Sequence, residues 1–246
     1  MKNILQLPAK ISPCPIIEAI FECRYEPKVP PDTIFGILYK QFSDFYPKLE
    51  NLPILQIPQQ IRLQDSNLRY QPYYRMSSEQ FILSIGPRAL SLSNINEYVG
   101  WRVFYAEIKK LIEIVKELDI AKKIVRFSLR YINYFNEDIL KKTNLVIRMG
   151  KQPIEAARTL VRLDIKANDF NNVIQISNDA ELRSKDKQLH GSVIDIDTYL
   201  EDIPINLFSD YKAMLSNCHL SEKKVFFSLL KRDFLKSLNP VYEEEL

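Results

Sequence analysis

Glycine is scarce in this chain, and its scarcity excludes two large classes of nucleotide-binding protein. Five glycines occur among the 246 residues, whereas the average composition of roughly 7% would supply about three times as many. They stand apart, and neither G-x-G-x-x-G nor G-x-x-x-x-G-K-[ST] occurs. A phosphate-binding loop needs clustered glycine so that backbone N–H groups can close around the phosphate. The sequence therefore excludes a P-loop and a Rossmann dinucleotide site.

Histidine and cysteine are also few, which restricts the chemistry open to the chain. The two histidines are His190 and His219, and the three cysteines are Cys14, Cys23 and Cys218. No HExxH, CxxC or GxSxG motif is present, so the common zinc and nucleophile arrangements have no residues to use. The thiols are too scattered for a disulfide framework. We expect no cofactor and no catalytic residue.

Long hydrophobic runs are missing as well. No stretch approaches the 18 or so apolar residues of a membrane-spanning helix, and Met1–Lys10 lacks the apolar core of a signal peptide. Hydrophobic residues make up 46% of the chain and charged residues 26%, with a formal net charge of +3. These values are typical of folded globular domains. We predict a cytoplasmic protein with no membrane partner.

The residues that are present show two regular patterns. In Ile16–Tyr25 apolar residues alternate with polar ones, which is typical of a strand with one buried face. In Trp101–Leu118 apolar residues recur at steps of three and four, which predicts an amphipathic helix. A second long helix is expected over residues 206–238, with a break near Cys218–Ser221.

The remaining segments predict short strands and one more helix. The helix is expected after Pro30–Pro31, with Asp32 as its cap and Phe45 on its apolar stripe. Pro72 confines its strand to a sheet edge or marks a bulge, and the polar tract Asn178–Lys187 predicts an exposed hairpin loop. The expected strands are Gln59–Gln64, Leu68–Ser77, Gln80–Ile85, Ala89–Asn94, Ile124–Phe135, Asn144–Met149, Ala157–Lys166, Asn172–Ser177 and Leu189–Tyr199, with a short helix at Glu137–Lys142.

In chain order these elements form two similar β-α-β4-α halves, at about 14–120 and 121–240. Phe21–Tyr25 resembles Phe127–Tyr131, and Val103–Tyr105 resembles Val225–Phe227. We predict an α+β fold in one compact domain, in which two pseudo-repeats form a largely antiparallel curved sheet backed by the long helices. The order resembles the saddle of TATA-binding-protein-like folds, a likeness that carries no function.

Several short segments, taken in their order along the chain, form a pattern. They are Pro15–Ala19 with Glu22 and Arg24–Tyr25, Gly100–Trp101 at a helix start, Arg130–Asn133, Asp195–Asp197, and Leu215, His219 and Phe226. Together they resemble a sporadically distributed family of uncharacterised prokaryotic proteins over nearly the whole chain. The resemblance implies no reaction, cofactor or catalytic residue. Its patchy distribution implies horizontally mobile genes and a phage-defence or mobile-element context.

The strand alternation gathers polar side chains on one predicted face, where arginine predominates. A guanidinium group is planar and suits bidentate contact with phosphate or carboxylate. A tyrosine ring on the same face would let a nucleic-acid base stack. The candidate anion-binding residues are Arg69, Arg75, Arg126, Arg130, Arg158 and Arg162, and the candidate stacking residues are Tyr73 and Tyr134.

Three interpretations of this face remain open. The leading one is a non-enzymatic binding protein that recognises an anionic partner, either nucleic acid or an acidic protein. In the second, Glu18, Glu22, Asp195 and Asp197 hold a divalent ion in a charged tunnel, and the protein hydrolyses polyphosphates or nucleotides. In the third, opposite charges simply pair across the strands of an interaction or structural module.

A homodimer is the remaining expectation. Tyr70, Tyr73 and Tyr74 surround Pro72 on a predicted edge strand. An exposed strand edge needs a cover, and a second copy of the chain would supply one.

Overall fold

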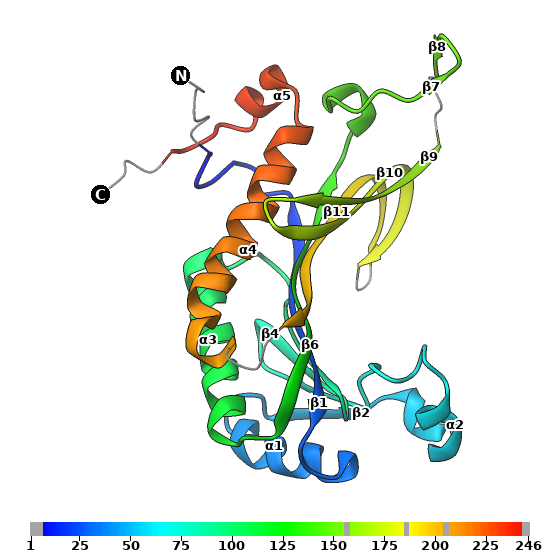
Figure 1. The fold of residues 1–246 in the computed structure, drawn as a ribbon. Helices are drawn as coiled ribbons and strands as arrows, with labels where there is room; N and C mark the ends of the chain where they lie inside the picture. Colours follow the sequence, from blue (N-terminus) through cyan, green and yellow to red (C-terminus); the bar gives the residue numbers. More distant parts are fainter. Residues whose placement is uncertain (1–6, 155–157, 185–186, 204–206, 243–246) are drawn as a thin grey trace. The chain divides into compact units, whose positions relative to one another are not determined.

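The computed structural model describes residues 7–154, 158–184, 187–203 and 207–242. It confirms the α+β class, because a nine-stranded antiparallel sheet accompanies the helices (Figure 1). The strand order is β2-β3-β4-β5-β1-β6-β11-β10-β9, and β7 and β8 form a separate two-stranded sheet. No helix in these ranges combines the length and the hydropathy that crossing a membrane requires.

The strands are β1 (Ile16–Pro27), β2 (Lys48–Asn51), β3 (Tyr74–Ser77), β4 (Phe81–Ile85), β5 (Ala89–Asn94), β6 (Ala121–Phe135), β7 (Arg148–Met149), β8 (Gln152–Pro153), β9 (Thr159–Ala167), β10 (Phe170–Ser184) and β11 (Lys187–Ile203). The α-helices are α1 (Ile34–Phe42), α2 (Gln59–Gln64), α3 (Trp101–Glu117), α4 (Leu207–Leu229) and α5 (Arg232–Ser237). Three short 3₁₀ helices are η1 (Pro31–Thr33), η2 (Pro53–Gln56) and η3 (Ile139–Lys142).

The chain divides into two compact units. Unit 1 consists of the described residues of Met1–Ile17, Tyr131–Thr198 and Cys218–Leu246. Unit 2 consists of Glu18–Arg130 and the described residues of Tyr199–Asn217. Strands β1, β6 and β11 and helix α4 contribute residues to both units.

The core of unit 2 follows the two patterns that the sequence shows. Along β1, Ala19, Phe21 and Tyr25 are buried, whereas Glu22 and Arg24 between them are partly exposed. Helix α3 buries Phe104, Ile108, Leu111, Ile112 and Val115. Both periodicities were predicted, and both are confirmed.

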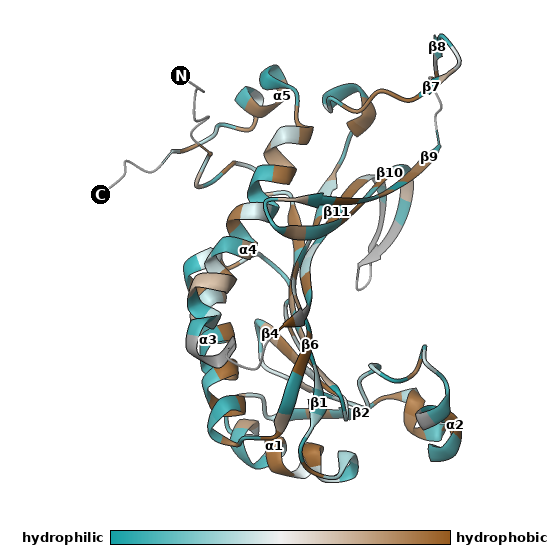
Figure 2. Ribbon diagram, viewed as in Figure 1, coloured by the Kyte–Doolittle hydropathy of each residue, from teal (hydrophilic) through white to brown (hydrophobic). Residues whose placement is uncertain are grey.

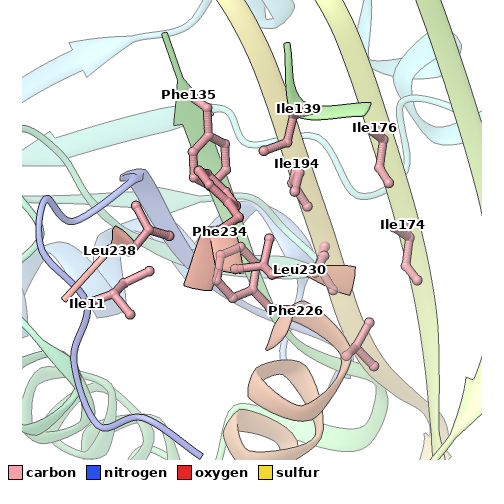
Figure 3. Close-up of a cluster of buried hydrophobic side chains, with 12 residues drawn as sticks. Ile11, Phe135, Ile139, Ile174, Ile176, Ile194, Phe226, Leu230, Phe234 and Leu238 are labelled. Atoms are coloured by element: carbon pink, nitrogen blue, oxygen red, sulfur yellow. The ribbon is translucent and has the colours of Figure 1, made fainter. Parts of the chain in front are cut away.

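The core of unit 1 lies where α4 and α5 contribute apolar side chains beside those of β6, β10 and β11 (Figure 3). Ile174 and Ile176 come from β10, and Ile194 comes from β11. Phe226 of α4 and Phe234 of α5 join the same cluster. A methyl-rich cluster of this kind supplies most of the favourable free energy of folding.

Two predicted elements of the first half are wrong. Gln59–Gln64 forms α2, because the N–H groups of Ile61 and Arg62 bond to the carbonyl of Pro58 and close a helical turn. A six-residue window is too short to separate a strand from a helix by period. The predicted strand Leu68–Ser77 shrinks to β3, since residues 66–70 are a turn and Pro72 has no N–H to donate. The prediction that it is an edge strand is also wrong, because β3 pairs with β2 on one side and with β4 on the other.

The ends of the first helix also differ from the prediction. Asp32 does not cap it, because the Asp32 carboxylate accepts from the side chain of Gln59, with Nε2–Oδ2 at 2.9 Å. Phe45 lies beyond the last turn of α1 and is exposed, whereas Ile34, Leu38 and Phe42 are buried.

Three predictions in the second half need correction. The break near Cys218–Ser221 is wrong, because α4 is continuous and the chain leaves it at Leu230–Lys231. The tract Asn178–Lys187 is mostly strand, since β10 continues to Ser184; Asn178 is buried and accepts from Ser192 Oγ at 2.6 Å. The strand Asn144–Met149 reduces to the two residues of β7. Residues 185, 186 and 206 lie outside the described residues.

Gly86 gives a direct test of packing in unit 2. A Cβ at Gly86 would lie 2.6 Å from the backbone oxygen of Gln71, whereas one at Gly36 in α1 would meet nothing within 4 Å. Gly86→Ala should therefore lower the free energy of unfolding by about 1–3 kcal/mol. Gly36→Ala should raise it by up to about 1 kcal/mol, because alanine favours helix. Urea denaturation measures both, and equal effects of the two substitutions would contradict this packing.

Candidate functional site

The six candidate arginines do not all lie on strands. Arg75 is on β3, Arg126 and Arg130 are on β6, and Arg162 is on β9. Arg69 lies in the turn before β3, and Arg158 precedes β9, so the prediction that strands carry these two is wrong. Arg69, Arg75, Arg126 and Arg130 belong to unit 2 with Tyr73, whereas Arg158, Arg162 and Tyr134 belong to unit 1.

Arg126 is a structural residue. It is only 8% exposed, and its Nη1 lies 2.8 Å from Oε1 of Glu22 and 2.7 Å from Oγ of Ser128. Its guanidinium also lies over the ring of Tyr199, with Cζ 4.4 Å from the ring centroid. The same Glu22 oxygen accepts from Nε of Arg24 at 2.8 Å. One carboxylate therefore holds two guanidinium groups on the polar side of β1 and β6.

Two further candidates form ion pairs at the surface. Arg75 Nη1 lies 3.3 Å from Oε2 of Glu50, and Arg162 Nη2 lies 3.3 Å from Oδ1 of Asp164. All four side chains are well exposed. Exposed pairs contribute roughly 0–1 kcal/mol, so a polyanion would compete with them at little cost.

Three arginines of unit 2 lie beside tyrosine rings in a group that we call the arginine–tyrosine cluster. Two guanidinium groups flank the ring of Tyr70, with Cζ 4.9 Å from its centroid for Arg24 and 5.5 Å for Arg69. Arg62 lies over the ring of Tyr73 at 4.4 Å. The members are Arg24, Arg62, Arg69, Tyr70 and Tyr73.

Arg62 and Arg69 differ in their neighbours from the arginines that form ion pairs, which are Arg24, Arg75, Arg126 and Arg162. Within residues 7–154 and the other described ranges, neither has a carboxylate partner. Arg62 donates from Nε to the carbonyl of Ile57 at 2.9 Å, which leaves its terminal nitrogens for other acceptors. Arg69 is exposed and contacts a ring only. These two cations can therefore receive an anion without first losing a carboxylate partner among the described residues.

Backbone contacts hold the cluster in place. The N–H of Tyr73 donates to Ile85, and its carbonyl accepts from Leu52, which ties this residue to two segments. Gly86 has no Cβ, so Gln71 can pass close to it between the two tyrosines. The backbone that carries Tyr73 is thus held by neighbouring segments of unit 2.

Tyr134 makes contacts of its own in unit 1. Its hydroxyl donates to the carbonyl of His190 at 3.0 Å, and its ring lies where a side chain at Gly191 would otherwise stand.

The four candidate metal ligands fall in different units. Glu18 and Glu22 belong to unit 2, and Asp195 and Asp197 belong to unit 1. Glu22 already binds two guanidinium groups. In the part of the chain that the structure describes, no three His, Cys, Asp or Glu side chains are grouped closely enough to hold a metal ion.

Cys23 has no feature of a reactive thiol. It lines an apolar cavity of about 20 Å³ together with side chains that include Phe21, Leu111 and Phe127. Burial, followed by the nearby charge of Glu22, raises the pKa of the Cys23 thiol to about 12. Nucleophilic cysteines have a lowered pKa instead, so Cys23 is a core residue.

Two titratable residues of α4 in unit 1 are withdrawn from solvent, Glu222 fully and His219 in part. His219 Nδ1 is 3.2 Å from the hydroxyl oxygen of Tyr131, and burial, aided by Lys223, lowers the pKa of His219 to about 3. Burial raises the pKa of Glu222 to about 8, and Lys223 opposes this only in part. Both shifts favour the uncharged forms of these side chains at neutral pH.

Sequence analysis did not select Arg62 as a candidate and did not connect it with the ring of Tyr73. The missed signal is the spacing Arg62, Arg69–Tyr70, Tyr73, which repeats a basic residue and an aromatic one within twelve positions. The strand prediction for Gln59–Gln64 placed Arg62 on the wrong kind of element and hid this pattern.

Comparison of the chain with protein-family models gave no match, and comparison with the curated proteins gave none either.

Glu22 provides a test of the buried charges. Glu22→Gln should lower the free energy of unfolding by about 3 kcal/mol, because the buried Arg126 then loses its 2.8 Å ion pair with the Glu22 carboxylate. The matched control is Glu50→Gln, which removes the exposed partner of Arg75 and should cost at most about 1 kcal/mol. Denaturant unfolding compares the two, and an equally small loss for both would show that Arg126 needs no carboxylate.

Glu222 gives a pH dependence with a definite sign. Its pKa is raised on folding, so the folded state binds a proton that the unfolded state releases, and stability falls as pH rises towards about 8. The lowered pKa of His219 has the opposite effect on stability, but only at pH values below the ordinary histidine pKa of 6.5. Between pH 6.5 and 8 the free energy of unfolding should therefore fall by about 2 kcal/mol.

The Glu222→Gln variant should lack this component, so the difference between wild type and variant isolates it. Thermal or urea unfolding at several pH values provides the measurement. Parallel pH profiles for the two proteins would contradict a protonated Glu222.

Proposed function

We propose that this chain is a non-enzymatic binding protein and that its arginine–tyrosine cluster takes a single-stranded nucleic acid. One observation carries the proposal: Arg62 and Arg69 lie over tyrosine rings and have no carboxylate partner among the described residues. Arginine beside an aromatic ring offers a phosphate a bidentate donor and a base a surface to stack on.

The cluster fits a flexible strand better than a duplex. Its charge and its rings come from α2, the turn at residues 66–70 and the polar side of β1, which together form one local group in unit 2. Single strands can turn their bases towards aromatic side chains, whereas a duplex keeps its bases stacked inside. Arg24 adds a third guanidinium, which Glu22 partly neutralises.

The other candidate arginines have a lesser part in the proposal. Arg75 and Arg162 would exchange an exposed carboxylate for a phosphate, whereas Arg126 is held by Glu22 and Ser128. The metal-dependent hydrolase has less support, because Glu22 binds arginine and the four proposed ligands lie in different units. An acidic protein partner is the alternative that the experiment below separates.

We also propose that the chain contains two related halves, as in a TATA-binding-protein-like fold. The sheet order supports this, because β5-β1 and β6-β11 meet at the centre and β4 and β10 follow outwards on each side. Each half then contributes one long helix, α3 or α4. The duplication adds nothing to the choice of ligand. A cytoplasmic location and a phage-defence or mobile-element context stay proposals of the sequence alone.

The salt dependence of binding tests the proposed function. The logarithm of the binding constant for a fluorescent single-stranded oligonucleotide should fall linearly with the logarithm of the salt concentration, because each phosphate contact releases counterions. The variant Arg62→Gln/Arg69→Gln should flatten that slope by about 1.4, at roughly 0.7 for each contact. The control Arg102→Gln/Arg232→Gln removes the same charge from exposed positions outside the cluster and should keep the slope.

Tyr70→Leu and Tyr73→Leu separate stacking from charge. Each should weaken oligonucleotide binding by roughly 5- to 150-fold, as expected for a lost stacking ring, with an unchanged salt slope. Absence of oligonucleotide binding at low salt would contradict the proposal. Equal binding of polyglutamate, with no effect of either tyrosine substitution, would assign the cluster to an acidic protein.

A further inference from the structure

Strand β9 ends the nine-stranded sheet with an exposed, partly apolar edge. Leu160, Leu163 and Ile165 are 72%, 37% and 41% exposed. The strand has nine residues and contains no proline or glycine. Natural proteins usually protect such an edge with a bulge, a proline or a covering element. Figure 2 shows the alternating hydropathy of this strand.

The β9–β10 hairpin determines which backbone groups face outwards. Asn168 and Asp169 have φ of 53° and 68°, as in a two-residue type I′ turn, and Ala167 pairs with Phe170. The closing pair of such a turn exchanges both hydrogen bonds, so the odd-numbered residues of β9 bond to β10. The N–H and C=O groups of the even-numbered residues, from Leu160 to Lys166, therefore point away from the sheet.

The sequence of β9 is complementary to itself when a second copy runs antiparallel about Leu163. Arg162 then lies opposite Asp164 of the second copy, and Asp164 lies opposite its Arg162. On the other face Leu163 meets Leu163, and Val161 meets Ile165. Shifting the register by one residue pair places Arg162 opposite Arg162, or Asp164 opposite Asp164, which like charges disfavour.

We propose that a second copy of this chain pairs its β9 with this β9, in the register centred on Leu163. In this register the outward groups of Leu160, Arg162, Asp164 and Lys166 form the hydrogen-bonded pairs, and Leu163 is a non-hydrogen-bonded pair, as the hairpin requires. The interface is isologous, so it closes after two copies and leaves no further edge of β9. The one Arg162–Asp164 pair already present within each strand then joins that of the other copy in one alternating network.

This dimer differs from the one that the tyrosines around Pro72 predict. It uses unit 1, whereas those tyrosines and the arginine–tyrosine cluster belong to unit 2. The proposed function and the β9 dimer can therefore fail separately.

Charge exchange tests the dimer by sedimentation velocity. The wild-type chain should dimerise at concentrations below about 100 µM, whereas Arg162→Asp alone and Asp164→Arg alone each place like charges opposite one another and should weaken dimerisation at least about tenfold. The double variant Arg162→Asp/Asp164→Arg restores the opposite charges and should restore the dimer. Lys48→Glu in the other edge strand, β2, is the control and should leave dimerisation unchanged.

Cysteine cross-linking tests the register without disturbing the charges. In a Cys14→Ser background, Leu163→Cys should form an intermolecular disulfide under mild oxidation, because Cα atoms of a non-hydrogen-bonded pair are about 4.5 Å apart. Leu160→Cys is the control: it is more exposed, but the two copies of residue 160 would lie about 20 Å apart along the strands. A monomeric wild type, a double variant that stays monomeric, or equal cross-linking at both positions would overturn the proposal.

Discussion

Successive side chains of a strand point to opposite faces of the sheet, and most of the structure depends on this constraint. In β1 the residues Ala19, Phe21 and Tyr25 are buried, so the chain places Glu22 and Arg24 on the opposite side. In unit 1 the same rule buries Ile194 and Ile196 of β11 near side chains of α4. Because strand side chains alternate between the two faces, the charged residues of β1 are separated from the apolar side chains of its core face.

Charged side chains on the polar face of the strands must pair with opposite charges where neighbouring residues bury them. Arg126 is deeply buried, and desolvating a guanidinium without a countercharge is costly. Glu22 removes that cost by accepting from Arg126 and Arg24 with a single oxygen. Strand arginines such as Arg24 and Arg126 therefore form ion pairs that stabilise the fold. Arg62 on α2 and Arg69 in the turn before β3 have no carboxylate partner among the described residues, so the fold does not use their charge in an ion pair.

An open sheet has a second consequence, since its two outermost strands keep one unpaired edge each. Strand β2 at one end is short and fully exposed, and its residues Lys48 and Glu50 carry charge. Charged, short edges resist pairing with other chains. Strand β9 at the other end is longer and presents leucine and isoleucine together with a self-complementary charge pattern. The two ends of one sheet are thus chemically unequal.

The sequence by itself determined the features that depend on local periodicity. The strand at Ile16–Tyr25 and the helix at Trp101–Leu118 were predicted because side-chain period is a local property. Local sequence also predicted arginine on the polar face, including Arg126. Only tertiary structure decided what each arginine does, because ion pairs such as Glu22–Arg126 join residues 104 positions apart. It also decided that Gln59–Gln64 is helical and that Arg62 joins Tyr73, since a short segment takes the conformation that its distant contacts stabilise.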